Sequence, residues 1–251
     1  MDRKPYKMKF RKNRIPDWIC PVCEKGVLNL RKGSFFSEET ALSKEAHQHE
    51  AWEPEWITYL YSCILDCTNN KCREKVLSVG NGTVDWEEGY DADGMPVQEW
   101  YDLFEPQFFY PNLKIFVCPE STPDKVKDHL NQSFSLVFTN PSSALNHLRI
   151  ALEELLNFMK VKRFNLRNRR RVPITLHKRI EAISSKYQSQ KDLLLAVKWL
   201  GNSGSHSGTD LSMDDVLDAY EIMEQLLKEV FDKSAVRARS MARKINRKRS
   251  H

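Results

Sequence analysis

The sequence predicts an α+β protein in which a β-rich N-terminal module is followed by an antiparallel α-helical bundle. Three observations lead to this expectation. Four of the six cysteines of the 251-residue chain form two close pairs in the first third. The segments around these cysteines are rich in aromatic and β-branched residues, which favour strands. From residue 122 onward, apolar residues recur with the 3.6-residue period of amphipathic helices.

The cysteine pairs predict an N-terminal zinc ribbon. The CPVC run at residues 20–23 has zinc-knuckle spacing, in which two thiolates of one tight turn reach the same Zn²⁺. The apolar run 56–65 predicts a strand leading into a second knuckle. We therefore expect one structural Zn²⁺ per chain, bound by Cys20, Cys23, Cys67 and Cys72. Cys63 is then a buried strand thiol; the alternative pairs Cys63 with Cys67 and leaves Cys72 free.

Strands are also expected between the second knuckle and the helical region. Residues 76–80 predict a short strand, and Asn81-Gly82 is typical of a hairpin turn. Residues 83–105 are acidic and aromatic, and the run 91–94 is expected to be a turn. It is not a calcium loop, because the other ligands are not at the required spacing. Irregular strands broken by Pro106 and Pro111 then link the two modules.

Five amphipathic segments predict the helical bundle. They cover residues 122–138, 140–161, 176–183, 192–201 and 212–231. The first two begin with a capping residue followed by proline, and Ser212 with Asp215 forms a capping box at the start of the last. Because the connections are short, successive helices are expected to be antiparallel.

The charges are segregated along the chain. The net charge of +5 combines +21 in residues 1–14, 160–171 and 233–251 with −16 in the other 206 residues. We divide the chain into a basic arm (1–14), a zinc-ribbon/β module (15–118), a helical bundle (119–231) and a basic tail (232–251). Clustered cations neutralise phosphates, so RNA or DNA is the expected partner. Solvated tails and an acidic protein partner are the alternatives.

The expected nucleic-acid contacts are the cations of a loop at 160–171 and of the tail. They are Lys162, Arg163, Arg167, Arg169, Arg170, Arg171, Arg243, Lys244, Arg247, Lys248 and Arg249. No apolar run approaches ~18 residues, and the first fifteen residues lack a hydrophobic core, so neither a membrane span nor a signal peptide is expected. We therefore expect a cytoplasmic protein with reduced cysteines and no membrane partner.

Three short motifs resemble a bacterial family of unknown function in the HEPN superfamily of helical nucleotide-binding and RNA-cutting domains. They are LRIALEELL at 148–156, LHKRI at 176–180, and Gly201-Asn202 followed by His206. The resemblance covers about residues 119–231. Members of this family often carry an N-terminal zinc ribbon and are found beside restriction enzymes and other anti-phage systems. The resemblance thus implies a HEPN-like bundle, a homodimer, and a defence or restriction partner protein.

The resemblance also implies an alternative function as a metal-independent endoribonuclease. Active members use an Arg, a polar residue directly after it, and a His four to six residues after the Arg. Here Asn202 and His206 match, Gly201 stands where the Arg is expected, and Lys198 is the nearest cation. A neutral imidazole can take the proton of a ribose hydroxyl near pH 7, which is the role implied for His206. Two other interpretations remain: Asn202 and His206 cap or bridge helices, and the protein is a protein-interaction adaptor.

Overall fold

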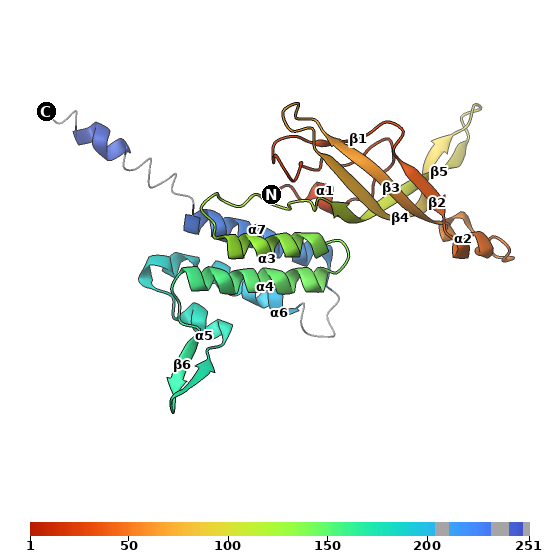
Figure 1. Ribbon diagram of the computed structural model, residues 1–251. Helices are drawn as coiled ribbons and strands as arrows, with labels where there is room; N and C mark the ends of the chain where they lie inside the picture. Colours follow the sequence, from red (N-terminus) through yellow and green to blue (C-terminus); the bar gives the residue numbers. More distant parts are fainter. Residues whose placement is uncertain (204–210, 232–240, 248–251) are drawn as a thin grey trace. The chain divides into compact units, whose positions relative to one another are not determined.

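The computed structural model describes residues 1–203, 211–231 and 241–247 (Figure 1). The chain divides into two compact units. The first comprises residues 1–115 together with 134–140, and the second comprises 116–133 together with the described part of 141–251. The first unit carries the large sheet, and the second is mainly helical, so the mixed α+β composition agrees with the sequence prediction.

A five-stranded antiparallel sheet forms the first unit (Figure 1). Its strands are β1 (Leu28–Leu30), β2 (Phe36–Glu39), β3 (Thr58–Cys67), β4 (Lys75–Tyr90) and β5 (Pro96–Tyr110). Strands β3, β4 and β5 follow one another as a meander, while β1 and β2 pair with different parts of β3. Three short helices accompany the sheet: α1 (Lys4–Lys7), α2 (Ala41–Ala46) and the 3₁₀ helix η1 (Pro54–Trp56).

Strand β4 continues through Asn81 and Gly82, so the hairpin turn predicted at these residues is wrong. Gly82 is opposite Phe104 of β5. A Cβ atom on Gly82 would lie 2.8 Å from the Phe104 ring. The glycine is therefore needed because an aromatic ring packs directly on the backbone, and not because the chain reverses there.

Strand β5 likewise continues through Pro106, where a break was expected. The register of β4 and β5 shifts between Val79 and Gly80, and Gly80 is opposite Pro106. A Cβ atom on Gly80 would overlap the carbonyl oxygen of Glu105. Because β5 is an edge strand and the proline is at an irregularity, the missing N–H of Pro106 costs the sheet little. The strand ends at Tyr110, directly before Pro111.

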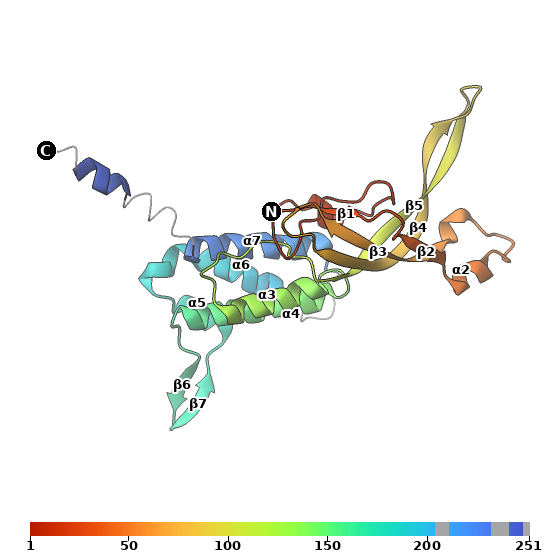
Figure 2. The ribbon, with the colours of Figure 1, turned by 45° about the horizontal axis from the view of Figure 1, so that its top comes forward.

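The outer part of β4 and β5 forms a two-stranded arm (Figure 2). Strand β3 begins at Thr58, opposite Thr83, so beyond this point β4 pairs only with β5. The arm turns at the predicted place: the Gly94 N–H donates to the Asp91 carbonyl, and Gly94 has a φ of 79°. Residues 83–105 contain no Lys or Arg, which makes the arm strongly acidic.

The basic N-terminal segment, which is distinct from the β4–β5 arm, packs on the sheet; the alternative that it is a solvated tail does not match this packing. Phe10 and Phe104 exchange two backbone hydrogen bonds of 2.8 Å, and the Trp18 indole donates to the Pro5 carbonyl at 2.7 Å. Phe10 and Trp18 are buried and contact each other edge to face. Phe10 also contacts Tyr61 of β3, so this segment completes the aromatic core of the first unit.

The second unit contains the helices predicted from the apolar periodicity. They are α3 (Asp124–Leu136), α4 (Pro141–Phe158), α5 (Leu176–Glu181), α6 (Lys191–Ser203) and α7 (Met213–Phe231), with a 3₁₀ helix η2 (Ser185–Gln190) before α6. The last residues of α3 belong to the first unit. Helices α4, α6 and α7 contact one another (Figure 1). The Ser133 hydroxyl of α3 donates to the Ala144 carbonyl of α4 and is hydrogen-bonded to the Tyr220 hydroxyl of α7.

Helix α6 extends beyond its predicted end. The helix was expected to stop at Gly201, but it continues to Ser203. Gly201 is buried, and a Cβ atom on it would lie 3.0 Å from the Cβ of Arg149 on α4. The glycine therefore allows α4 and α6 to approach closely, and it does not cap the helix. The interpretation of Gly201-Asn202 as a helix end is wrong.

The expected basic loop at 160–171 is largely a β-hairpin. Strands β6 (Phe164–Arg167) and β7 (Arg170–Pro173) pair with each other (Figure 2). Asn168 and Arg169 connect them and have φ values of 50° and 61°. Two successive residues with positive φ suit a tight hairpin turn, and asparagine adopts this conformation more readily than most residues.

None of the helices in the described ranges combines the length and apolar character that crossing a bilayer requires.

Candidate metal centre

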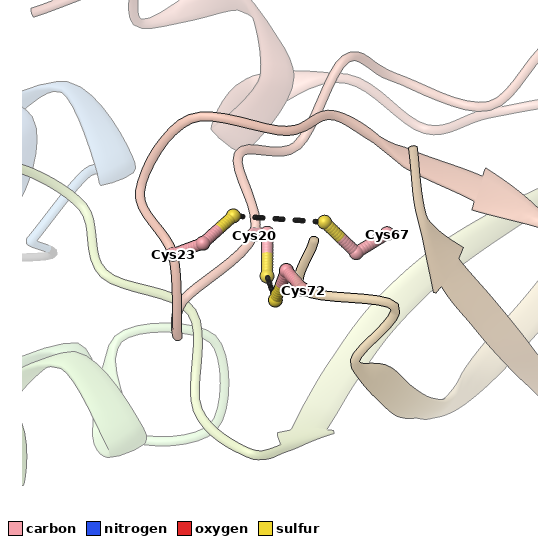
Figure 3. A group of neighbouring side chains, drawn as sticks. All are labelled: Cys20, Cys23, Cys67 and Cys72. Carbon is pink, nitrogen blue, oxygen red and sulfur yellow. Dashed lines mark hydrogen bonds between the residues drawn. The ribbon is translucent and has the colours of Figure 1, made fainter. Parts of the chain in front are cut away.

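Four cysteine side chains of the first unit converge on one point (Figure 3). The Sγ atoms of Cys20, Cys23, Cys67 and Cys72 all lie within 4.8 Å of one another. The Cys23–Cys67 and Cys20–Cys72 sulfur pairs are separated by 3.6 and 3.9 Å. Four sulfurs at ~2.3 Å from a central ion form a tetrahedron with edges of ~3.8 Å. The cluster therefore has the dimensions to hold one metal ion.

Two similar turns position the four sulfurs. In the first, the Glu24 N–H donates to the Cys20 carbonyl, and Glu24 has a φ of 55°. In the second, the Cys72 and Arg73 N–H groups both donate to the Asn69 carbonyl, and Arg73 has a φ of 53°. Each turn thus places a residue with left-handed backbone directly after its second cysteine. The pairing of β1 with β3, in which Leu28 is opposite Cys67, brings the two turns together.

Backbone N–H groups are directed at two of the sulfurs. The Gly26 N–H donates to the Cys23 sulfur and the Asn69 N–H to the Cys67 sulfur, both at 3.4 Å. Donors from the Gly26 and Lys25 backbone lower the pKa of Cys23 to about 6. A Cβ atom on Gly26 would lie 2.5 Å from the Cys67 sulfur and 2.9 Å from the Asn69 nitrogen. Glycine at position 26 is therefore required by the close approach of the second turn.

The four cysteines differ in their exposure to solvent. Cys20 and Cys67 are buried, whereas Cys23 and Cys72 are half-buried. Burial raises the pKa of the Cys67 thiol to about 12. A bound cation favours the thiolate form of its ligands, so metal binding releases protons from such thiols. With four sulfurs around one ion, no coordination position is left for a substrate.

Cys63 is not part of the cluster formed by the described residues. It lies in the middle of β3, opposite Ser78, and is 1% exposed. Burial raises the pKa of its thiol to about 12. The structure thus brings Cys72 to the other three cysteines, and the alternative set containing Cys63 in its place does not match this geometry.

Two family models match the chain. Residues 8–109 match a domain of unknown function, DUF8608, and residues 131–249 match another, DUF4145. The chain thus contains two domains of unknown function. No curated protein and no solved structure matches it. The DUF8608 region contains all four clustered cysteines, and the DUF4145 region contains the β6–β7 hairpin and helices α4–α7.

Within the DUF4145 region, the structure locates only part of the predicted catalytic motif. Lys198 of α6 is 7% exposed, and its Nζ lies 3.1 Å from the centroid of the Trp199 ring. Asn202 is half-buried on the same helix, one turn later. His206 lies outside the described residues. Lys198 is therefore close to an indole ring and largely shielded from solvent.

A cluster of charged side chains lies between α4 and α5; the i,i+4 pair of Arg149 and Glu153 was expected from the sequence, but the buried position of Arg179 beside it was not. Arg179 of α5 is 3% exposed, and its guanidinium donates to the Asn157 side chain at 2.6 Å. The Glu153 carboxylate lies 4.0 Å from Arg179 and 3.7 Å from Arg149. Burial lowers the pKa of Arg179. The sequence contained one signal for the burial of Arg179: it follows Leu176 by three residues, which places it on the apolar face of its helix.

The predicted nucleic-acid contacts are distributed over two exposed segments. The exposed cations of the first segment are Lys162, Arg163, Arg167, Arg169, Arg170 and Arg171. In the tail, Arg243, Lys244 and Arg247 are exposed on a helical stretch at 241–247, while Lys248 and Arg249 lie outside the described residues. Within the ranges that the structure describes, no carboxylate forms an ion pair with the hairpin arginines 167–171.

Proposed function

We propose that this protein binds nucleic acid through its β6–β7 hairpin and that it combines a zinc-ribbon domain with a HEPN-like helical domain. The observation that carries the proposal is the exposure of the hairpin arginines without carboxylate partners among the described residues. Unpaired surface cations repel one another, so concentrating them on one hairpin has an electrostatic cost. A polyanionic ligand removes this cost.

The type of cation supports phosphate as the ligand. The cations of the hairpin at 167–171 are all arginine and none is lysine. A guanidinium offers a planar fork of donors that matches phosphate oxygens. Phe164 at the base of the hairpin is 44% exposed and offers a ring on which a base can stack. Phosphate contacts carry no base information, so the proposed binding tolerates many RNA or DNA sequences.

Zinc is the metal that we propose for the cysteine cluster. Four thiolates in a closed tetrahedral arrangement are typical of structural Zn²⁺ sites, and thiolates disfavour hard cations such as Mg²⁺ and Ca²⁺. The sulfur separations of 3.6 and 3.9 Å support this assignment. One Zn²⁺ per chain would then hold the two turns of the zinc ribbon together.

The HEPN-like assignment, the homodimer and the defence context depend on the resemblance of residues 119–231. The arrangement of α4, α6 and α7 as mutually contacting helices supports a bundle of this kind. Trp199 of α6 is 56% exposed in the single chain, and a large exposed ring suits a protein interface. We propose that α6 contributes to a homodimer interface and that a restriction or anti-phage system supplies the partner protein.

A second candidate function is metal-independent RNA cleavage with His206 as the proton-transferring group. The observation that favours it is the position of Arg149, whose Cβ and Cγ atoms lie against Gly201, next to Asn202, while its guanidinium lies 3.7 Å from the Glu153 carboxylate. Arg149 would supply the guanidinium that the motif itself lacks. The test is a nuclease assay with His206→Ala and Arg149→Lys. Loss of cleavage in the alanine variant supports this function, whereas cleavage by the parent that persists in His206→Ala excludes the assigned role.

Nucleic-acid binding is tested with the full chain and fluorescently labelled RNA and DNA. Substituting Arg169, Arg170 and Arg171 by Gln should weaken binding by roughly tenfold or more at low salt, because about three phosphate contacts are lost. The matched control substitutes Lys125, Lys186 and Lys228 by Gln, which removes the same charge elsewhere in the second unit. Equal weakening in both variants would show that net charge, and not the hairpin, determines binding.

A further inference from the structure

We propose that a groove along the N-terminal arm is a binding site for single-stranded nucleic acid, separate from the β6–β7 hairpin. This inference extends the proposed function and rests on it. The groove consists of two adjoining cavities of about 640 and 750 Å³. Both are lined by Arg11, Asn13 and Tyr101, so these residues lie where the cavities meet. All lining residues belong to the first unit.

Arg11 presents a fixed, flat surface between the two cavities. Its two terminal nitrogens donate to the two carboxylate oxygens of Glu87 at 3.1 and 2.7 Å. Its Cζ lies 3.3 Å from the centroid of the Tyr101 ring. The guanidinium is thus held at its edge by Glu87 and on one face by Tyr101, while the Arg11 side chain is still 34% exposed. In the proposed site, a planar ligand stacks on the face of the guanidinium opposite Tyr101.

Cations lie on both sides of this surface. The first cavity is lined by Lys12, Arg31 and Lys32 together with Asp102. The second is lined by Lys4, Lys9 and Arg14 together with Asp2, Asp17 and Glu87. With Arg11, which lines both, the cations outnumber the carboxylates in each cavity. Arg31 is paired with Asp66, but Lys12 and Lys32 are exposed, and neither has an ion-pair partner among the residues that the structure describes. Lys12 instead lies 5.4 Å from the centroid of the Phe35 ring. Phosphates on either side of a stacked base would meet these lysines and Arg14.

The contacts that Arg11 already makes favour a nucleobase over an acidic peptide as its ligand. A peptide carboxylate binds a guanidinium best through its donor edge, in the bidentate geometry that Glu87 already occupies. What Arg11 still offers is a face, and arginine planes are surfaces on which unpaired bases stack. Bases in a duplex are already stacked, so the ligand class is single-stranded RNA or DNA.

Two sets of variants of the full chain test the two parts of the site separately. Arg11→Lys keeps the charge and removes the flat surface. We expect binding of a labelled 12-nucleotide oligouridine to weaken about tenfold with an unchanged salt slope, because a base stack is worth about 1–3 kcal/mol. The Lys12→Gln/Lys32→Gln double variant should lower the salt slope by about two contacts of ~0.7 each. Lys125→Gln/Lys186→Gln, which alters exposed lysines outside both cavities and away from the cysteine cluster, is the control.

The outcomes distinguish the groove from the hairpin. If both groove variants bind as the parent does while the Arg169/Arg170/Arg171 variant loses affinity, the groove inference is wrong and the proposed function stands. If the parent binds no oligonucleotide, the groove inference and the proposed function are both wrong. Polyglutamate that displaces oligouridine from the parent but not from the groove variants would identify an acidic peptide as the ligand. Bound metal and thermal unfolding, unchanged from the parent, show that each variant is folded.

Discussion

The Sγ atoms of Cys23 and Cys67 lie 3.6 Å apart, although 44 positions separate them in the sequence. Cys23 belongs to the turn before β1, and Cys67 is the last residue of β3. The antiparallel pairing of β1 and β3 brings the two turns together through the backbone of the sheet. A metal bound by both turns would therefore stabilise the sheet register, and the sheet would pre-form the metal site.

Cys67→Ser should abolish metal binding and destabilise the first unit. The metal-binding free energy of such sites is largely folding free energy. The first unit should therefore unfold, while helices α4–α7 keep their circular dichroism signal. Elemental analysis of the purified chain should find one zinc per parent chain and none in the variant. Cys63→Ala is the control: it removes a buried thiol outside the cluster, so it should lower the Tm but retain the metal.

Gly26→Ala should weaken metal binding without removing a ligand. The added Cβ would lie 2.5 Å from the Cys67 sulfur, which forces the two turns apart. Competition with a chelator should show a metal affinity at least tenfold lower than in the parent. Gly33→Ala is a matched control, because Gly33 has a φ of 77° and no neighbour within 4 Å of an added Cβ. It should cost about 1 kcal/mol of stability and leave the metal affinity unchanged.

The helices were predictable from the sequence because their determinants are local. The apolar periodicity and the capping residues lie within each helix, as for Ser212 and Asp215 at the start of α7. The first cysteine turn was predictable for the same reason, since the CxxC spacing is local. In the second turn the sequence favoured Cys72 but left Cys63 open, and only the fold, which brings Cys72 to the other three cysteines, decides between them.

The glycines were misinterpreted because their role depends on distant partners. Gly82 is opposite Phe104, and Gly201 lies against Arg149 of another helix. A sequence pattern that indicates a turn or a helix end is equally compatible with close packing, and only the fold distinguishes them. The groove was missed for a related reason: Arg11, Glu87 and Tyr101 come from three segments that only the sheet brings together.

Ser212→Ala should destabilise α7 and change the titration of Asp215. Ser212 donates to the Asp215 carboxylate through its N–H and its hydroxyl, and it accepts from the Asp215 N–H. Loss of the cap should cost about 1 kcal/mol in chemical denaturation. The donors lower the pKa of Asp215, so its stabilising contribution is present above the ordinary carboxyl pKa and is lost as the pH falls. NMR titration should show a higher Asp215 pKa in the variant; an unchanged value would contradict the role of Ser212.

Trp199→Asp should dissociate the proposed homodimer. Light scattering of the parent at micromolar concentration should give about twice the mass of one chain, and the variant should give the monomer mass. Leu166→Asp, which places the same charge at another exposed apolar position of the second unit, is the control and should remain dimeric. A monomeric parent would contradict the dimer, and a dimeric Trp199→Asp variant would exclude Trp199 from the interface.

The salt dependence of nucleic-acid binding tests the central claim most directly. The affinity of the full chain for a short duplex and for a single strand is measured over a series of salt concentrations. Substitution of Arg169, Arg170 and Arg171 by Gln should reduce the slope of log K against log[salt] by about three contacts, each worth ~0.9 on a duplex or ~0.7 on a single strand. The Lys125/Lys186/Lys228 control should keep the parental slope. A hairpin variant that matches the parent in both affinity and slope would contradict the assignment of the β6–β7 hairpin as a nucleic-acid-binding surface.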